Sequence, residues 1–73
     1  MTVDGVVDIF RKILEVDDVQ VDSDFFVLGG DSLLATRVLS AIDRQFGVEL
    51  TFADLMSAPS PIGLSKCIAS AAG

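Results

Sequence analysis

Residues 24–34 decide how this chain folds, and they read Asp-Phe-Phe-Val-Leu-Gly-Gly-Asp-Ser-Leu-Leu. Two glycines, Gly29 and Gly30, break the chain directly before an apolar pattern of helical period, so a helix is predicted to begin at about Asp31 or Ser32. One of these two residues could simply cap that helix. Main-chain N–H groups and the helix dipole favour a negative group there, so a phosphoryl group on Ser32 would be well placed. The glycines would let another macromolecule approach the backbone.

The segment after this stretch is predicted to be a helix that ends at Gly47, a typical C′ residue. The expected inward side chains are Ala35, Val38, Leu39, Ile42 and Phe46, and the expected outward ones are Leu33, Thr36, Arg37, Ser40 and Arg44. Before it, residues 15–31 hold six acids and no Lys or Arg, which predicts a long loop. We expect the loop to pack through Val16, Val19 and Val21, and to be anchored at its far end by Phe25, Phe26 and Leu28.

Three further helices are predicted around this centre. Near the N-terminus, one apolar stripe contains Val3, Val6, Val7, Phe10, Ile13 and Leu14. After a short extended link at 48–50, Thr51 and Asp54 resemble a capping box for a short helix that carries Phe52, Leu55 and Met56. Pro59 ends it, and Ser60 with Pro61 begins a last helix through about Ala71, with Leu64, Ile68 and Ala72 inward. The prediction is an all-α fold, a small four-helix bundle of three main helices and one short helix, forming a single domain over residues 1–73.

The composition excludes several functional classes. The 73 residues include 11 acids, five Lys or Arg, one Cys and no His, for a net charge of −6. An acidic chain is a poor binder of nucleic acid or of an anionic membrane. Without His there is no Ser-His or Cys-His pair, and the lone Cys67, interpreted as a small core residue, allows neither an internal disulfide nor a CxxC zinc site. We expect no catalytic residue, no metal site, no nucleic-acid or membrane partner, a monomer and a cytoplasmic location.

Enzyme and metal motifs around Ser32 do not fit. Leu34 stands where a nucleophile elbow needs its second glycine, and no lysine completes a phosphate loop. A calcium loop starting at Asp22 would place Phe26, Val27 and Leu33 at positions that require a ligand, Gly and Glu. A hydrolase that uses Ser32 is therefore disfavoured.

The run from Asp24 to Ala35 resembles the core motif of peptidyl carrier proteins, the thiolation domains of nonribosomal peptide synthetases and members of the acyl-carrier-protein-like superfamily. Other parts of the chain also resemble that family, namely residues 13–16, residues 46–50, the Leu55-Met56 pair and Pro59-Ser60. The likeness therefore covers roughly residues 3–70. Pro61 stands where the family usually has a β-branched or aliphatic residue. We expect Ile62 to take over the packing of that residue.

The resemblance implies a carrier and not a catalyst. A phosphopantetheinyl transferase would use coenzyme A and magnesium to attach 4′-phosphopantetheine to Ser32, and the thiol of this arm would hold an aminoacyl or peptidyl group as a thioester. Gly29, Gly30 and Asp31 would belong to the same cofactor-binding segment, and in the family the residue matching Asp31 is linked to the transferase's metal. Expected partners are the transferase and adenylation, condensation, tailoring and thioesterase enzymes or domains.

The partner surface is predicted at Leu33, Thr36, Arg37 and Met56, although Leu33 could be an ordinary surface residue and Met56 could fill the core. Residues 32–46 carry two Arg and one Asp, a net of +1. That favours a peptidyl carrier over fatty-acid carriers, whose corresponding helix is markedly acidic. The alternatives are an acyl carrier of a polyketide or fatty-acid-type pathway, or a small helical interaction module in which Ser32 is only a cap.

Overall fold

The computed structural model describes residues 2–72. Its elements are α1 (Thr2–Leu14), α2 (Ser32–Phe46), α3 (Phe52–Ser57) and α4 (Pro61–Ala72). The expected all-α fold of three main helices and one short helix is confirmed. Within this described part of the chain, each helix is too short or too polar to cross a lipid bilayer.

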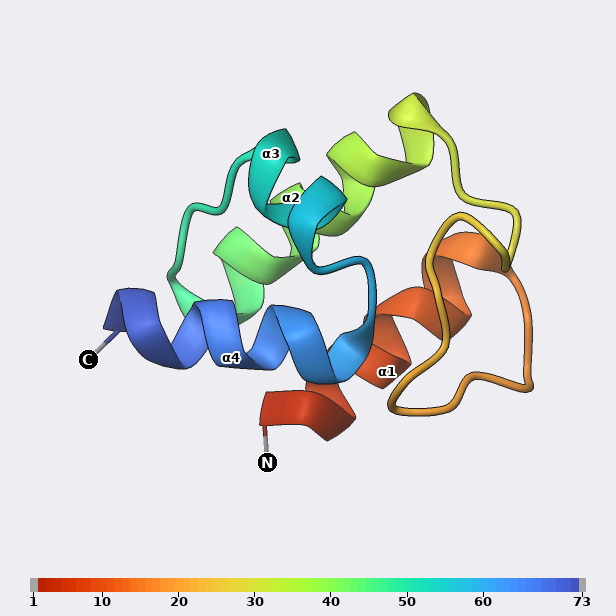
Figure 1. Cartoon of the computed structure of the whole chain (residues 1–73), viewed down its shortest axis with the longest axis horizontal. Coiled ribbons are helices and arrows are strands. Elements are labelled where there is room, and N and C mark those ends of the chain that lie inside the picture. Colours follow the sequence, from red (N-terminus) through yellow and green to blue (C-terminus); the bar gives the residue numbers. More distant parts are fainter. Residues whose placement is uncertain (1, 73) are drawn as a thin grey trace.

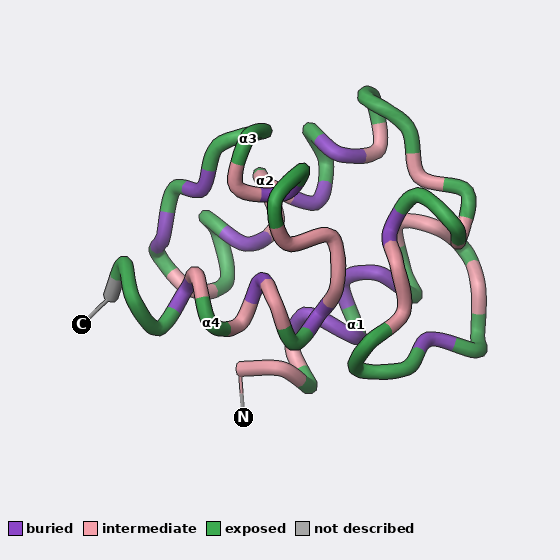
Figure 2. Tube along the Cα trace, in the orientation of Figure 1, coloured by how far each residue is buried: buried purple, intermediate pink, exposed green. Residues whose placement is uncertain are grey.

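The helices pack around α1, which contacts both α2 and α4, while the short α3 contacts α2 and α4 (Figure 1). The loop between α1 and α2 makes a wide excursion beside α1 before it reaches the start of α2. Buried side chains come from all four helices, from this loop and from the link between α2 and α3, and Figure 2 marks the buried stretches along the trace.

The buried face of α1 is wider than the predicted stripe. Val6, Val7 and Phe10 are buried as predicted, but Ile9 is buried as well, and Val3 is only half-buried. The reason is that α1 contacts two helices, so residues on two neighbouring sides of it are covered. A single amphipathic stripe describes a helix with one packing partner.

On α2, the prediction of the buried face is partly wrong. Ala35, Val38 and Ile42 are fully buried, whereas Leu39 and Phe46 are half-buried at the margin of the core. The ring of Phe46 lies against α1, where a Cβ on Gly5 would be 2.6 Å from its Cζ atom. Phe46 thus fills the edge of the α1–α2 contact and not its centre.

The loop between α1 and α2 is held at a few points. Val19 is buried and Val16 packs partly against the core, but Val21 is 48% exposed, contrary to the prediction. The contribution of Val21 comes from its backbone, because its carbonyl accepts a hydrogen bond from the N–H of Ile62 at 2.8 Å. The Val21 side chain is therefore not needed to hold the loop at this point, because the backbone hydrogen bond to Ile62 does so.

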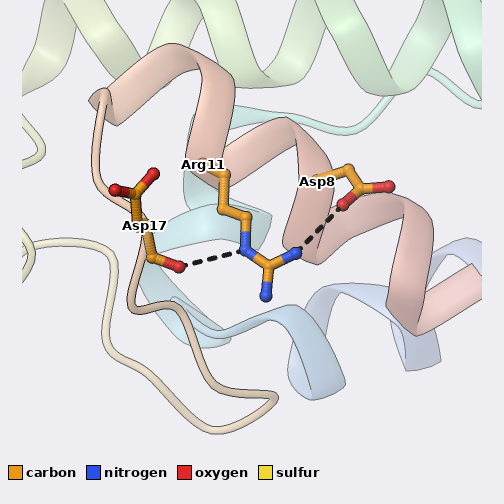
Figure 3. A network of polar contacts seen from close by, with 3 residues as sticks. All are labelled: Asp8, Arg11 and Asp17. Carbon is orange, nitrogen blue, oxygen red and sulfur yellow. Dashed lines mark hydrogen bonds and ion pairs between the residues drawn. The ribbon is translucent and has the colours of Figure 1, made fainter.

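Arg11 of α1 holds the beginning of this loop from outside the core (Figure 3). Its Nε donates to the carbonyl of Asp17 at 3.2 Å, and its terminal nitrogen lies 3.4 Å from a carboxylate oxygen of Asp8. The ion pair is solvent-exposed and therefore contributes about 0–1 kcal/mol. The bond to the Asp17 carbonyl joins α1 to the first residues of the loop.

The caps of the later helices agree with the predictions. Gly47 adopts a left-handed conformation (φ 69°) and ends α2, and Thr51 with Asp54 forms a complete capping box for α3. The Ser60 hydroxyl accepts from the N–H of Gly63 at 3.1 Å, and Pro61 is the first residue of α4.

The packing of the last helix corrects one expectation. Pro61 is fully buried and Ile62 is 39% exposed, so the proline itself fills this part of the core and Ile62 does not replace it. Leu64 and Ile68 are buried as predicted, and Cys67 packs partly against the core. The side chain of Ala72, also predicted inward, lies outside the described residues.

Candidate functional site

Ser32 is the first residue of α2, and Asp31 is its N-cap. The backbone of Asp31 is extended, and its carboxylate accepts from the N–H of Leu34 at 2.9 Å. Of the two residues that could have capped the helix, Asp31 therefore does so. The Ser32 side chain is exposed, and its hydroxyl has no hydrogen-bond partner among residues 2–72.

The segment before Ser32 is a tight turn organised by Asp24. The carboxylate of Asp24 accepts from the N–H groups of Phe26 and Val27 at 2.8 and 3.1 Å, and its carbonyl accepts from Leu28 at 3.0 Å. Gly29 follows with φ +104°, a conformation that L side chains rarely adopt. This turn brings the chain back to the start of α2.

Phe25 fixes the turn to the body of the molecule. Its ring is fully buried and meets the ring of Phe10 edge-on at a centroid distance of 5.5 Å. Its N–H donates to the carbonyl of Pro59 at 2.6 Å, and its own carbonyl accepts from Gly30 at 2.9 Å. The start of α2 is thus attached to α1 through a side chain and to the α3–α4 junction through the backbone.

The two glycines have different structural roles. Gly30 lies on the ring of Phe25, so a Cβ at this position would overlap that ring. Gly29 is exposed, and a Cβ there would meet nothing within 4 Å. We expected both glycines to let another macromolecule approach the backbone. The space beside Gly29 is open, so the structure permits such an approach there. At Gly30 that space is filled by the Phe25 ring, which explains the absence of a side chain.

Several large apolar side chains near Ser32 in the sequence, or on α3, are exposed. Leu33 is 65% exposed as predicted, and Met56 is 56% exposed, which excludes the alternative that Met56 fills the core. Phe26, expected to anchor the loop, is 38% exposed, and Val27 is 83% exposed. Sequence reasoning did not single out Val27, because a loop residue has no periodicity from which its orientation could be read.

The polar residues around Ser32 do not form a catalytic arrangement. Thr36 is exposed and donates from its hydroxyl to the Ser32 carbonyl at 3.1 Å, and Arg37 is exposed. The Asp31 carboxylate is bound to the helix N-terminus and not to the Ser32 hydroxyl. No base among the described residues is therefore placed to activate this serine. The Ser32 hydroxyl is instead open to solvent.

Comparison with known proteins decides the family. The family described as "phosphopantetheine attachment site" matches residues 4–68. The chain belongs to this family. A dimodular nonribosomal peptide synthase of Bacillus subtilis (strain 168) is 42% identical over 59 residues, which are 81% of this chain and 2% of that protein. The carrier domain thus spans a small fraction of the curated relatives that it matches.

Two solved structures have the same fold as this carrier domain. The peptidyl carrier protein bound to the phosphopantetheine transferase Sfp and coenzyme A has a TM-score of 0.92 and 26% identity, covering 96% of this chain and 91% of that one. A docking-domain complex of the Pax nonribosomal peptide synthetase has a TM-score of 0.90 and 34% identity, covering 97% of this chain and 68% of that one. The predicted peptidyl-carrier type and acyl-carrier-protein-like fold are confirmed.

The cofactor of this carrier domain is 4′-phosphopantetheine, and the domain itself is not a catalyst. The start of α2 fits such a group on two grounds. An exposed serine hydroxyl without a partner in the described chain is free to be esterified. In addition, the first turn of a helix carries N–H groups and a partial positive charge that favour the phosphate next to the attachment point.

Proposed function

We propose that Ser32 carries the 4′-phosphopantetheine arm and that the domain holds an aminoacyl or peptidyl group on it as a thioester, for delivery to partner domains in nonribosomal peptide biosynthesis. The observation that carries this proposal is the exposed Ser32 hydroxyl, which lies directly after the Asp31 cap and has no hydrogen-bond partner within residues 2–72. When bound, the arm supplies a mobile thiol. Cys67 is half-buried in α4 and packs against the core, so it is a poor substitute for that thiol.

The residues before Ser32 position it for modification. Asp31 holds the first turn of α2 together and leaves a carboxylate oxygen exposed to solvent, and we propose that this carboxylate also contributes to the magnesium-dependent transfer from coenzyme A. Gly30 keeps the turn against Phe25, and Gly29 leaves an uncovered stretch of backbone for the transferase. These three residues form the cofactor-binding segment together with Ser32.

The partner surface that we propose contains Leu33, Thr36, Arg37 and Met56, all of which are exposed. Exposed apolar side chains beside an attachment point suit repeated, reversible contacts with several enzymes. The proposed partners are the transferase and adenylation, condensation, tailoring and thioesterase domains. We further propose that residues 1–73 act as a single monomeric carrier domain, and that it works in the cytoplasm, where coenzyme A is available to the transferase.

Intact-mass measurement tests the attachment site. The unmodified domain is incubated with coenzyme A, magnesium and a broad-specificity phosphopantetheinyl transferase, alongside the variants Ser32→Ala and Ser40→Ala. Ser40 is a matched control because it is an exposed serine on the same helix. The parent and Ser40→Ala should gain one phosphopantetheinyl unit, and Ser32→Ala should gain none.

The outcome separates the carrier from the interaction module. No mass gain on a folded parent protein would refute Ser32 as the attachment site and would favour the interaction module. A gain on the parent that persists in Ser32→Ala would place the arm on another serine. A second experiment then tests the kind of cargo. The modified domain is incubated either with adenylation enzymes and their amino acids or with acyl-transferring enzymes, and the reaction that loads it shows whether the cargo is aminoacyl or a polyketide-type acyl group.

A further inference from the structure

Two grooves lie on either side of the exposed ridge of α2. The larger, with a volume of about 640 Å³, lies between α1 and α2 and is lined by Ile13 and by α2 side chains between Thr36 and Gln45. The smaller, of about 310 Å³, lies on the side of α3 and includes Asp43, Glu49 and Phe52. Thr36 and Ser40 line both grooves and form the ridge between them.

The two grooves differ in charge. Arg37 and Arg44 line the α1–α2 groove, which contains no carboxylate, whereas the second groove contains two carboxylates and no cation. Arg37 and Arg44 are exposed, and neither forms an ion pair with any residue in the described range 2–72. They are seven residues apart, which places them on the same face of the helix about two turns apart. In a chain of net charge −6, this groove is a local basic site.

The α1–α2 groove is centred away from Ser32, although two of its lining residues, Thr36 and Arg37, also belong to the partner surface proposed above. At about 100° per residue, its α2 residues are centred roughly 130° around the helix axis from Ser32. Its lining includes Ile13 and Ala41, both half-buried and packed against the core, so it has an apolar part beside the two arginines of α2. A polypeptide segment centred over Ala41 and Arg44 would therefore lie on a different side of α2 from the Ser32 hydroxyl.

We propose that this groove binds an acidic, amphipathic helical segment of a partner protein, which keeps the partner attached while the Ser32 side of the helix remains free. Apolar side chains of that segment would lie over Ile13 and Ala41, and its carboxylates would pair with Arg37 and Arg44, as in helix-in-groove recognition. The proposal deepens the partner surface proposed above and rests on it, because Thr36 and Arg37 belong to both, but it does not require an arm on Ser32.

Other occupants fit less well. A second copy docked through the same face would place the two arginine pairs opposite each other, and two chains of charge −6 also repel at a distance. Nucleic acid would meet the same overall repulsion, and no aromatic side chain lines the groove to stack with bases. An acidic helix is attracted by the two arginines of the groove and repelled by the net negative charge of the chain, which favours binding at this groove.

A titration of the unmodified domain tests the proposal. The probes are two synthetic amphipathic peptides of about 15 residues, long enough to form a helix, with identical leucine faces and either Glu or Lys at the flanking positions. Amide chemical shifts of the labelled domain are followed at low and high salt. The Glu peptide should shift the amides of Ile13 and of residues 36–45, and salt should weaken its binding, whereas the Lys peptide should not bind there.

Three variants identify the cause of any binding. Arg37→Glu/Arg44→Glu should weaken binding of the Glu peptide about tenfold or more. Lys12→Glu/Lys66→Glu changes the net charge equally at exposed positions outside the groove and should weaken it much less. Ser40→Trp occupies groove volume without changing charge and should also reduce binding.

Four outcomes would overturn the proposal. These are equal affinity for the two peptides, an equal loss in both charge variants, shifts centred on the α3 side, and the absence of any binding by the Glu peptide. Because all these measurements use the unmodified protein, their result is separate from that of the Ser32 test.

Discussion

Phe25 and Phe26 are adjacent residues of the same type with opposite environments. Phe25 is completely buried and joins the turn before α2 to Phe10 of α1, whereas Phe26 is 38% exposed and touches Phe25 edge-on at 5.2 Å. The two residues lie in the turn organised by Asp24, whose carboxylate accepts from the Phe26 N–H. The comparison shows that the two sides of this short segment differ: its inner side packs into the core before the start of α2, and its outer side is partly exposed to solvent.

The largest expected effect distinguishes these two sides directly. Phe25→Ala should lower the free energy of unfolding by about 3–5 kcal/mol, because it leaves a cavity in the core. A core of this size supplies only about 3–5 kcal/mol in total, so the variant should be largely unfolded. Phe26→Ala is the matched control and should remain folded. Circular dichroism and urea unfolding measure both, and equal losses in the two variants would show that the distinction is wrong.

A smaller loss is expected where the backbone touches Phe25. Gly30→Ala should cost about 1–3 kcal/mol, since the added methyl group overlaps the Phe25 ring. Phe25→Leu should relieve part of that overlap, so the double variant Phe25→Leu/Gly30→Ala should lose less stability than the sum of the single variants. Urea unfolding of all four proteins gives the coupling energy. Strict additivity would contradict the packing described.

Asp31 allows stability and modification to be separated. Asp31→Ala should cost about 1 kcal/mol, because the cap on the Leu34 N–H is lost, while Asp31→Asn should keep most of the cap. If the carboxylate also takes part in the magnesium-dependent transfer, Asp31→Asn should be loaded more slowly at nearly unchanged stability. Thermal unfolding and the rate of mass gain test this. Normal loading of the Asn variant would limit Asp31 to its capping role.

The smallest effect on stability is expected on the outer side. Leu33→Ala should change the free energy of unfolding by no more than about 0.5 kcal/mol, as is usual for exposed positions. Loading by the transferase, or transfer to a partner domain, should nevertheless become slower. A Leu33→Ala variant that is loaded and discharged at the parent's rate would remove Leu33 from the partner surface.

The sequence predicted the helices well because each boundary is marked by local chemistry. The left-handed Gly47, the Thr51–Asp54 box and the Ser60–Pro61 start all act within one turn of the chain. Ser32 at the beginning of α2 followed from the same kind of signal. Which of Asp31 and Ser32 serves as the cap did not, because both residue types are good caps.

Burial outside the regular helical pattern was harder to predict. Val21, Phe26 and Val27 lie in a loop, where no period relates one side chain to the next, and their exposure depends on the Asp24 turn and on Val21's backbone bond to α4. Phe46 lies on the predicted inward side of α2, but that side reaches the margin of the core before the helix ends. The burial of these side chains depends on how the helices and the loop pack against one another, and a local sequence pattern carries no information about that packing.

The two backbone hydrogen bonds between the long loop and the α3–α4 region have a consequence for hydrogen exchange. Val21 and Phe25 bond to Ile62 and Pro59, residues that follow them by more than thirty positions. The turn before Ser32 is therefore not an independent local unit, because opening the α3–α4 junction breaks both backbone bonds and leaves the Phe25 ring to hold the turn to α1. The amide protons of Phe25 and Ile62 should exchange with solvent in the same opening event, so the protection of the Phe25 amide reports on the stability of the α3–α4 region.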